Sequence, residues 1–471
     1  MFIFRCCTLV LAACMATGCA LRETQPKAPQ LPESFAGHAG GAETWPSARW
    51  YEGFGSAELQ ALVAEAAANN LDLAMARARI MQADARARQA GAAILPSVDA
   101  GANGNYLAGH SSSGGAHETD WAALLSASYE IDFWGKNRAT ARSAHLQASA
   151  SRADRDTLAL TTLAGVANAY FQVLSLRERL AIAYANVDAA KKLLDIVQAR
   201  FDAGLSNPVE LAIQKSTLAA AALVIPDLRQ QESEGLAALA VLLGRAPEQF
   251  SIDAQSLDTL VEPAVAPGLP SELLTRRPDV YMAEANMRAA NADLTVARAA
   301  LFPSLSLTAS GGVQNPALNA AVISLSGVGP TLSLGASISQ VIFDGGRLRA
   351  ARAEAQAKQE ELVTAYRAAI LAALVDVENA LSALHHLDDA RALQDTSLAQ
   401  SERAFEGATL RFKAGSGDFL TTLEAQRTLY AAREQFSQYR LTRLQTLVAL
   451  CKSLGGGWQA QDSGYFLGES R

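Results

Sequence analysis

The sequence consists of two copies of the same half-protein. Early in each copy, matching residues lie 207 positions apart, as in Asp72 and Asp279, Met75 and Met282, Ala83 and Ala290, and Pro96 and Pro303. Further along, the spacing becomes 211 and stays constant, as in Gly135 and Gly346, Asn168 and Asn379, Phe201 and Phe412, and Gly244 and Gly455. Solenoid and propeller repeats are ~20 to 50 residues long, so the chain is a duplicated half-protein and not a repeat array.

The composition favours long helices that pack through small side chains. Alanine is abundant, whereas aromatic residues make up 6% and charged residues 18% of the 471 residues. A chain of this length would ordinarily form domains of ~150 residues, but the duplication indicates one elongated body. The net charge is −7 and both signs are interspersed, so no basic face is present and nucleic acid is excluded as a partner.

The N-terminus has the pattern of an export signal. Arg5 precedes an apolar stretch that is too short for a permanent membrane helix. We predict that residues 1–18 are a lipoprotein signal peptide, because Ala16-Thr17-Gly18-Cys19 resembles a bacterial lipobox in which Cys19 becomes the lipidated first residue. Lipidation at Cys14 and an ordinary cleaved signal without lipid remain open alternatives.

The first residues after Cys19 are expected to form a tether. Residues 19–56 include a stretch rich in proline, glycine and small polar residues, which predicts a lipid anchor followed by an extended N-terminal tether. Beyond residue 19 the sequence contains one cysteine, Cys451, so no disulfide can form within a mature chain. Stability must therefore come from packing and assembly.

Helical segments dominate both copies. Residues 57–89 contain neither proline nor glycine, which predicts one unbroken helix that is closed by Gly91 and Pro96. The segment from Gly135 to Gly204 lacks proline and predicts a single helix of ~100 Å, which is too long for one compact domain. The equivalent segment, Gly346 to Gly415, has the same length.

Each long helix is followed by a tight turn and a return helix. Gly204 and Gly415 suit the left-handed C-terminal stop, and Asn207 suits the N-cap of the first return helix. Asp418 takes the place of Asn207 in the second copy. A return helix of ~55 Å and the ~50 Å helix before the strands together match the ~100 Å helix, so we expect the two short helices to stack end to end along the long one.

Period-two segments interrupt the helices. Residues 97–132 and 304–343 alternate apolar with small polar residues, which predicts one strand hairpin in each copy. A polar loop at residues 110–120 separates the two strands of the first hairpin. Strands of ~10 residues with one apolar face match transmembrane β-strands, and the edge of a soluble β-sandwich is the alternative.

These elements predict six segments along the chain. After the signal peptide and tether, the first repeat covers residues 57–244 and a linker in the equatorial region covers residues 245–270. The second repeat covers residues 271–455, and a C-terminal tail covers residues 456–471.

Four strands cannot close a barrel. An open sheet edge in lipid leaves backbone groups unsatisfied, so other copies of the chain must complete the wall. Three chains would supply twelve strands, within the range of outer-membrane barrels. The predicted fold is therefore mainly α with a small transmembrane β part, in which duplicated strand hairpins and long coiled-coil helices form a trimeric 12-stranded β-barrel on an α-helical barrel.

Six motifs occur in order over nearly the whole mature chain: Trp50 with Phe54, Asn70-Leu71-Asp72-Leu73, Glu130-Ile131-Asp132-Phe133-Trp134-Gly135, Leu273-Leu274 with Arg276-Arg277-Pro278-Asp279-Val280, Ala300-Leu301-Phe302-Pro303-Ser304, and Phe343-Asp344-Gly345-Gly346-Arg347-Leu348. Together they resemble the TolC-like outer membrane factor lipoproteins of Gram-negative tripartite efflux systems of the RND type, in the NodT-type group. The resemblance implies a homotrimer with a β-barrel in the outer membrane and an α-helical barrel in the periplasm. It also implies that the hairpin tips, at Gly204, Asn207 and Gly415, dock to a periplasmic membrane fusion protein and an inner-membrane transporter.

The resemblance further implies a gate just past the second turn. Glu424 stands where an inward acidic residue is expected, and Asp418 and Thr421 are the other candidate gate residues. The best-known member links its tip through a tyrosine, an arginine and an aspartate, whose places are taken here by Phe412, Gly417 and Thr421. The alternatives are a plain helix cap for Asp418 and a solvated helix face for Glu424.

The predicted function is a passive exit duct for drugs or other toxic small molecules, gated at its periplasmic tip. An enzyme would need a positioned nucleophile, phosphate loop or metal, and adjacent His385 and His386 point in different directions on a helix. We therefore expect no catalysis, metal or cofactor. A duct for type I protein secretion and a non-channel coiled-coil adaptor of the envelope are the alternatives.

Overall fold

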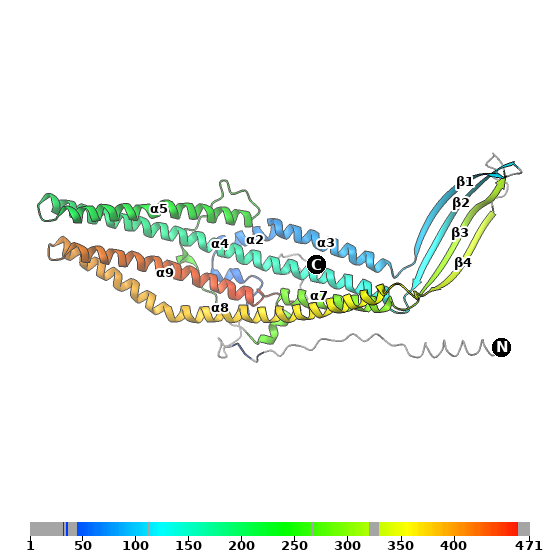
Figure 1. The fold of residues 1–471 in the computed structure, drawn as a ribbon. Coiled ribbons are helices and arrows are strands. Elements are labelled where there is room, and N and C mark those ends of the chain that lie inside the picture. The colour runs from blue at the N-terminus through cyan, green and yellow to red at the C-terminus, as the bar shows by residue number, and fades with distance from the viewer. Residues whose placement is uncertain are drawn as a thin grey trace. The chain divides into compact units, whose positions relative to one another are not determined.

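The computed structural model describes residues 32, 34, 35, 45–111, 114–265, 268–319 and 329–459 (Figure 1). The predicted signal peptide, Cys14 and Cys19 lie outside the described residues, as do most of the predicted tether and the end of the C-terminal tail. The chain divides into two compact units, and each unit contains parts of both sequence repeats. Among the described residues, unit 1 comprises those within 80–151 and 283–367, and unit 2 comprises those within 32–79, 152–282 and 368–459.

Unit 1 contains one antiparallel sheet of four strands. The strands are β1 (Ser97–Ser111), β2 (Gly114–Ile131), β3 (Ser304–Asn319) and β4 (Gly329–Ser339), in the spatial order β1-β2-β3-β4. Each repeat thus supplies one hairpin, and β2 pairs with β3 across the repeats. Among the described residues, the outer edges of β1 and β4 have no further strand beside them.

The strands of the first hairpin are longer than the sequence indicated. We expected a polar loop at residues 110–120, but β1 continues to Ser111 and β2 begins at Gly114. The residues continue the antiparallel ladder, with His110 opposite Gly115 and Ser111 opposite Gly114. Backbone pairing therefore overrides the polar composition of this segment.

The register aligns the apolar positions of all four strands on one face of the sheet. Val98 lies opposite Ala127, which lies opposite Ala309, which lies opposite Leu334. Residues directly opposite each other point to the same face, so the apolar face predicted for each hairpin becomes one continuous surface. The neighbouring rows carry the polar face, in which Asp99, Ser126, Ser310 and Ser333 are aligned.

Long helices dominate the rest of the chain. Helices α4 (Lys136–Asp202) and α8 (Arg347–Lys413) each contain 67 residues, as the single long helices predicted from the sequence. Their return helices are α5 (Pro208–Leu242) and α9 (Phe419–Ser453), of 35 residues each. All four helices begin and end at positions that differ by 211 between the repeats. Helix α5 continues through Pro226.

The first predicted helix is wrong in one respect, because it is broken at Asn70. The structure has α2 (Ala57–Asn69) and α3 (Leu71–Ala92), and Asn70 has ψ 130°. The buried Asn70 side chain accepts a hydrogen bond from the backbone N–H of Leu73, which caps α3 (3.1 Å), and donates to the carbonyl oxygen of Leu242 (2.9 Å). The break therefore depends on the end of α5, which lies far away in the sequence.

The second repeat has the same joint with different residues. Its helices before the strands are α6 (Leu273–Arg276) and α7 (Pro278–Ala299). Arg277 donates to the carbonyl oxygen of Ser453, the last residue of α9 (2.9 Å), as Asn70 donates to the last residue of α5. Gly244 and Gly455 follow the two return helices, and a Cβ atom there would clash with the carbonyl oxygens of Asn69 and Arg276. Each return helix therefore ends against the short helices of its own repeat. Helix α5 ends at the joint between α2 and α3, and α9 ends at the joint between α6 and α7.

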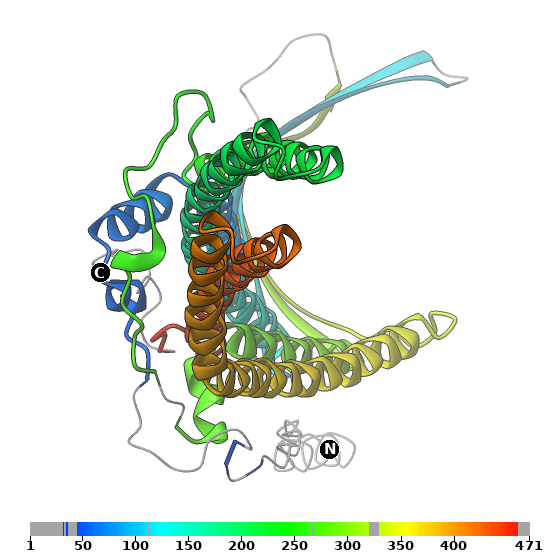
Figure 2. The ribbon, with the colours of Figure 1, turned by 90° about the vertical axis from the view of Figure 1, so that its left-hand side faces the viewer.

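Side-chain contacts place α4 and α9 at the centre of unit 2. Helix α5 binds α4 through Glu232 and Arg177 (2.8 Å), α4 binds α9 through Arg179 and Glu434 (2.8 Å), and α9 binds α8 through Arg433 and Glu402 (2.9 Å). These ion pairs give the order α5, α4, α9, α8. Figure 2 shows the four helices viewed from the end at which their turns lie. By length and composition alone, α4, α5 and α8 are each apolar enough to cross a membrane.

A compact core lies where the short elements of unit 2 meet the long helices. It includes η1 (Trp50–Phe54), α2 and the middle of α4, and its largest fully buried side chains include Tyr170, Phe171 and Phe54. The linker, which contains η2 (Leu257–Thr259), is attached to α9 by ion pairs from Arg440 to Asp258 (2.7 Å) and from Arg443 to Glu262 (2.8 Å). A further short helix, η3 (Pro270–Glu272), leads into α6.

Candidate functional site: the membrane sheet and the helical tips

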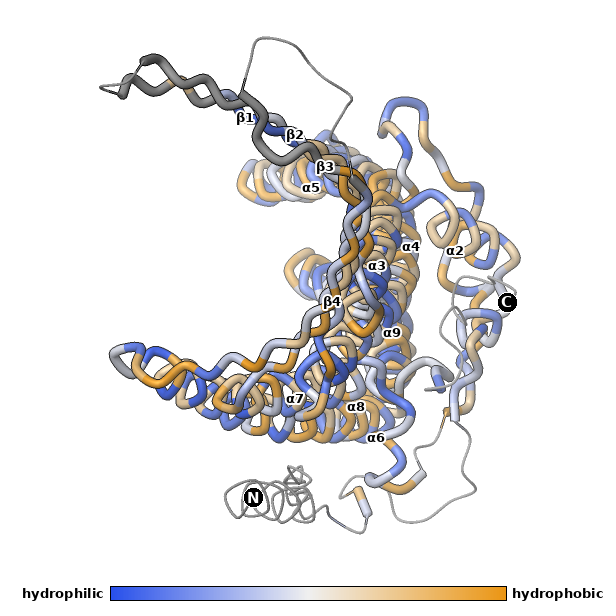
Figure 3. Tube along the Cα trace, turned by 90° about the vertical axis from the view of Figure 1, so that its right-hand side faces the viewer, coloured by the Kyte–Doolittle hydropathy of each residue, from blue (hydrophilic) through white to orange (hydrophobic). Residues whose placement is uncertain are grey.

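The apolar face of the sheet is exposed. Leu332 and Leu334 each have 79% of their surface exposed, Ile338 has 74% and Val98 has 62%. In Figure 3 the colour along β4 alternates between hydrophobic and more polar residues, as expected for a strand with two different faces. An exposed apolar surface of this kind is unfavourable in water and favourable against lipid.

The opposite face of the sheet carries hydroxyl groups that pair across the strands. The hydroxyl oxygens of Ser310 and Ser333 lie 2.7 Å apart, and those of Ser97 and Ser128 lie 3.0 Å apart. Small polar side chains leave room for water and satisfy one another where water is absent. The sheet therefore separates an apolar face from a hydrophilic face.

The two hairpin tips have the turn chemistry that the sequence predicts. Gly204 and Gly415 have φ values of 75° and 77°, which side chains with a Cβ atom rarely adopt. The Asn207 side chain accepts hydrogen bonds from the N–H groups of Val209 (2.9 Å) and Glu210 (3.0 Å), so it caps α5. Both turns are exposed at the ends of unit 2.

Asp418 caps α9 in the same manner. Its carboxylate accepts hydrogen bonds from the N–H (2.8 Å) and the hydroxyl group (2.6 Å) of Thr421. The hydroxyl bond, followed by the backbone bond, holds the pKa of Asp418 below its ordinary value. The structure therefore gives Asp418 a capping role and brings Asp418 and Thr421 together.

Glu424 lies one turn further along α9. It is exposed, and no hydrogen bond or ion pair is found for its side chain among the described residues. Asp418, Thr421 and Glu424 follow one another at intervals of three, so they share an exposed side of the first turns of α9. A role for these residues in gating stays a prediction.

The two tips also share a contact that the sequence motifs did not predict. Arg200 of α4 lies with its guanidinium 4.9 Å from the centre of the Phe412 ring and donates to the Phe412 carbonyl oxygen (3.3 Å). Phe412 belongs to a buried cluster formed by Leu193, Val197, Phe412, Phe419 and Leu423. The repeated Arg-Phe pairs, Arg200-Phe201 and Arg411-Phe412, were the available signal.

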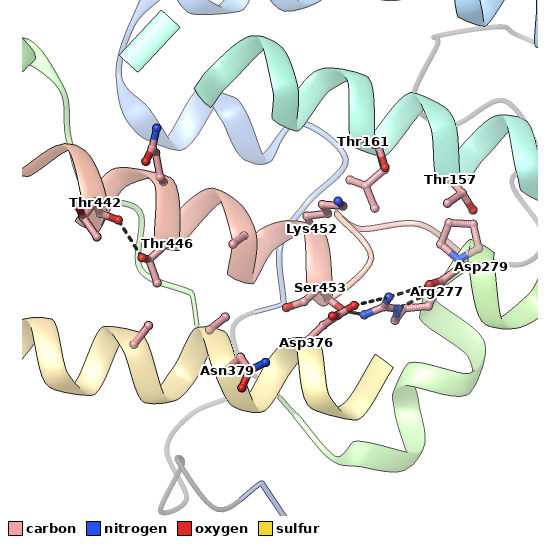
Figure 4. Close-up of a pocket in the computed structure, with 16 residues that line it drawn as sticks. Thr157, Thr161, Arg277, Asp279, Asp376, Asn379, Thr442, Thr446, Lys452 and Ser453 are labelled. Atoms are coloured by element: carbon pink, nitrogen blue, oxygen red, sulfur yellow. Dashed lines mark hydrogen bonds and ion pairs between the residues drawn. The ribbon is translucent and has the colours of Figure 1, made fainter. Parts of the chain in front are cut away.

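A second polar centre lies at the joint between α7 and α9. Figure 4 shows Arg277 beside Asp279 and Asp376, with Nη2 2.7 Å and 3.0 Å from their carboxylate oxygens. Burial alone would lower the pKa of Arg277, but the hydrogen bonds and charge of Asp279 and Asp376 raise it. A cavity of about 440 Å³ adjoins these residues and is also lined by Lys452. The sequence motif Arg276-Arg277-Pro278-Asp279 contains two of the three charged residues, Arg277 and Asp279. The third residue, Asp376, comes from the distant helix α8.

The family described as outer membrane efflux protein matches the chain twice, over residues 62–245 and 269–456. The chain belongs to the outer membrane efflux protein family. It is 43% identical over 465 residues to the pyoverdine export outer membrane protein OpmQ of Pseudomonas aeruginosa, with 97% of this chain and 96% of OpmQ covered. It is 28% identical to the cation efflux system protein CusC of Escherichia coli, with 96% of this chain and 99% of CusC covered. The solved structure of the outer-membrane channel OprN matches 93% of this chain and 99% of that chain, with a TM-score of 0.84 and 27% identity.

These findings confirm the predicted fold class, which is mainly helical with a small β part built from duplicated hairpins. They also confirm the resemblance to the outer membrane factors of tripartite efflux systems. The protein is an outer membrane efflux channel that extends into the periplasm. The relatives are channel proteins and not enzymes.

Proposed function

We propose that three copies of the chain form one continuous passive duct from the periplasm to the exterior. The observation that carries this proposal is the register of the sheet, which gathers the apolar side chains on one face and leaves β1 and β4 as open edges. An open edge in lipid leaves backbone N–H and C=O groups without partners. In the trimer, β4 of one copy pairs with β1 of the next, and the twelve strands close.

The two faces of the sheet then have separate roles. The face with Leu332, Leu334 and Ile338 contacts the acyl chains, and the face with Ser310 and Ser333 lines a water-filled lumen. The hydroxyl groups are uncharged, and Asp99 adds a carboxylate to the same row of the lumen face. A lining of mostly small polar side chains supports transport of chemically diverse small molecules without a tight binding site.

The helical tips supply the gate and the docking surface. Three copies of Glu424 on the exposed side of α9 would form a ring of carboxylates, which attracts cations. The turns at Gly204, Asn207 and Gly415 dock to a periplasmic membrane fusion protein, which connects the duct to an inner-membrane transporter. A lipid on Cys19 anchors the N-terminus in the outer membrane.

The first cargo to test is a secreted small metabolite of the pyoverdine type. OpmQ is named for pyoverdine export and is 43% identical to this chain over nearly the full length of both. CusC, named for cation efflux, is 28% identical. The test compares secretion of pyoverdine by a strain that lacks OpmQ with and without this protein, and restored secretion supports the assignment.

The duct itself is tested with purified protein in planar bilayers. We expect trimers that resist SDS and dissociate to single chains on heating, and stepwise conductance that requires the trimer. A heat-insensitive monomer without conductance would reject the trimeric duct and favour a non-channel adaptor of the envelope.

A further inference from the structure

The joint between α9 and α7 carries charges that the equivalent joint of the first repeat lacks. In both joints, a side chain between two short helices donates to the carbonyl oxygen of the last residue of the return helix. However, Asp376 of α8 corresponds to Gly165 of α4, and Lys452 of α9 corresponds to Val241 of α5. The first joint therefore forms without either charge, so packing alone does not account for Asp376 and Lys452.

The cavity of about 440 Å³ at this charged joint, which we call the joint cavity, has all of its lining residues in unit 2. Cavities of ~300–1,000 Å³ hold small organic molecules in many proteins. The wall combines apolar side chains with hydroxyl and amide groups, which include Thr157, Thr161, Asn379, Thr442 and Thr446. Apolar surface with a few polar groups is typical of a binding site.

One side of the joint cavity is negative. Arg277 lies between the carboxylates of Asp279 (2.7 Å) and Asp376 (3.0 Å), so two negative charges surround one positive charge. Asp279 alone would balance the charge of Arg277. The side chain of Asp376 is 54% exposed, and among the described residues only its Oδ2 atom is bound to Arg277. Asp376 therefore presents an excess negative charge to the cavity.

The other side of the joint cavity is positive. Lys452 is exposed, and its ammonium group forms no ion pair or hydrogen bond within the part of the chain that the structure describes. Figure 4 shows Lys452 and Thr161 on one side of the cavity, and Asp376 and Asn379 on the other. Lys452 and Asp376 do not pair with each other, so both charges remain available to a solute.

The joint cavity opens on the side of α9 that faces away from the core of unit 2. Leu444 belongs to this core, whereas Thr442 and Thr446 line the cavity. Residues two positions apart on a helix lie ~200° apart around its axis, so the cavity and the core occupy opposite sides of α9. Figure 2 shows η1, α2 and the linker along one side of the long helices. A duct bounded by the long helices has these short elements outside, and the joint cavity then faces the lumen.

We propose that the joint cavity binds zwitterionic solutes, such as an amino acid or a short peptide, as they pass through the duct. The carboxylate of the solute binds Lys452, with the hydroxyl groups of Thr157 and Thr161 as further donors, and its ammonium group binds Asp376. This inference rests on the proposed duct and assigns a class of cargo to it. Both charged side chains are open to solvent, so binding is weak and the solute is released to continue through the lumen.

The site is tested by titrating three related dipeptides into the detergent-solubilised trimer and measuring their binding by saturation-transfer NMR. L-Alanyl-L-alanine carries both charges, its N-acetyl derivative lacks the ammonium group, and its C-terminal amide lacks the carboxylate. We expect the zwitterion to bind about fivefold more tightly than either derivative, because an exposed ion pair adds up to this much to an affinity. Equal binding of the zwitterion and one derivative would indicate a site for a single charge and would overturn the proposal.

Two variants assign each charge of the solute to its partner. Lys452→Gln should weaken binding of the zwitterion about fivefold and leave binding of the amide unchanged, because the amide has no carboxylate. Asp376→Asn should weaken the zwitterion equally and leave the N-acetyl derivative unchanged, and its carbonyl oxygen can still accept from Arg277. Lys452→Arg should retain binding, and Lys215→Gln, which removes an exposed charge of α5 outside the cavity, should have no effect. If neither Lys452→Gln nor Asp376→Asn weakens the zwitterion, the joint cavity is not its site.

Access from the lumen is tested by a thiol placed in the joint cavity. A Thr446→Cys trimer in a planar bilayer should change its conductance when a charged methanethiosulfonate reagent is added, and L-alanyl-L-alanine should slow this reaction. The original protein is the control, because its Cys451 is buried. Modification of the thiol without a change in conductance would mean that the cavity does not face the lumen, and would overturn the proposal.

Failure of the site and failure of the duct give different results. A trimer without conductance would reject the proposed duct and this inference with it. A conducting trimer that binds none of the three dipeptides at concentrations up to ~10 mM would overturn the joint cavity as a binding site and leave the duct standing.

Discussion

A charge placed on the exposed apolar face of the sheet tests which face contacts lipid. Leu334 lies in the middle of β4, with 79% of its surface exposed and Ala309 opposite it on β3. We expect Leu334→Arg to cost ~2–4 kcal/mol per copy at the bilayer midplane, and thus ~6–12 kcal/mol per trimer. Because folded domains are stabilised by only about 5–15 kcal/mol, few trimers should insert.

Ser333→Arg is the matched control, because it adds the same charge one residue away on the opposite face. Ser333 loses its hydrogen bond with Ser310, which costs about 1 kcal/mol per copy, but the guanidinium group stays hydrated in the lumen. Ile338→Arg tests depth, since Ile338 is 74% exposed on the apolar face but lies next to the end of β4 at Ser339. Its cost should fall to about 0–1 kcal/mol per copy near the interface.

The assay is the fraction of heat-modifiable trimer that inserts into liposomes, followed by the single-channel conductance of the inserted protein. Leu334→Arg should insert least, Ile338→Arg should insert nearly as well as the original, and Ser333→Arg should insert but conduct differently. Equal insertion of Leu334→Arg and Ser333→Arg would contradict the assignment of the two faces. Lower insertion of Ser333→Arg than of Leu334→Arg would reverse it.

Three other predictions concern unit 2. Arg277→Ala should lower the free energy of unfolding by about 3 kcal/mol, because Asp279 and Asp376 lose their shared cation. Asn70→Ala at the equivalent joint should lower the free energy of unfolding by about 2 kcal/mol. Urea unfolding in detergent measures both values. Glu424→Ala should raise the open probability or reduce cation selectivity in planar bilayers. The control variant Glu406→Ala, near the end of α8, should change neither property. Identical currents for both variants would exclude Glu424 from the gate. Burial raises the pKa of the Cys451 thiol to about 12, so alkylation by iodoacetamide at pH 8 should require unfolding, and rapid labelling of the folded trimer would refute this burial.

The ends of the long helices were predictable because local residues determine them. A glycine after α4 or α8 and an Asn or Asp cap before α5 or α9 act within a few residues of the turn. Each helix end could be assigned from two independent positions, because the same ends recur 211 residues later in the second repeat.

The break at Asn70 could not be predicted in the same way. Residues 57–89 contain no helix-breaking residue, and the side chain of Asn70 finds its acceptor at Leu242, 172 positions away. The partners of Arg277 are similarly remote, because Asp376 and Ser453 come from α8 and α9. Such joints depend on how the short helices meet along the long one, and sequence periodicity does not report that contact.

The candidate gate could be predicted from the sequence only in part. The capping of α9 by Asp418 follows from local sequence, and the structure bears it out through the two hydrogen bonds with Thr421. The contact between Arg200 and Phe412 joins residues 212 positions apart. Whether Glu424 faces the lumen depends on neighbouring copies, so it stays a prediction.

The sequence by itself determined the duplication, the lengths of the helices and the two-faced strands, because periodicity, caps and turns are local properties of the chain. It also showed that four strands are too few to close a barrel. Only the tertiary structure decided the register that merges two hairpins into one apolar face, and the joints at Asn70 and Arg277. These features depend on contacts between distant segments, where one residue of slip moves every side chain of a strand to the other face.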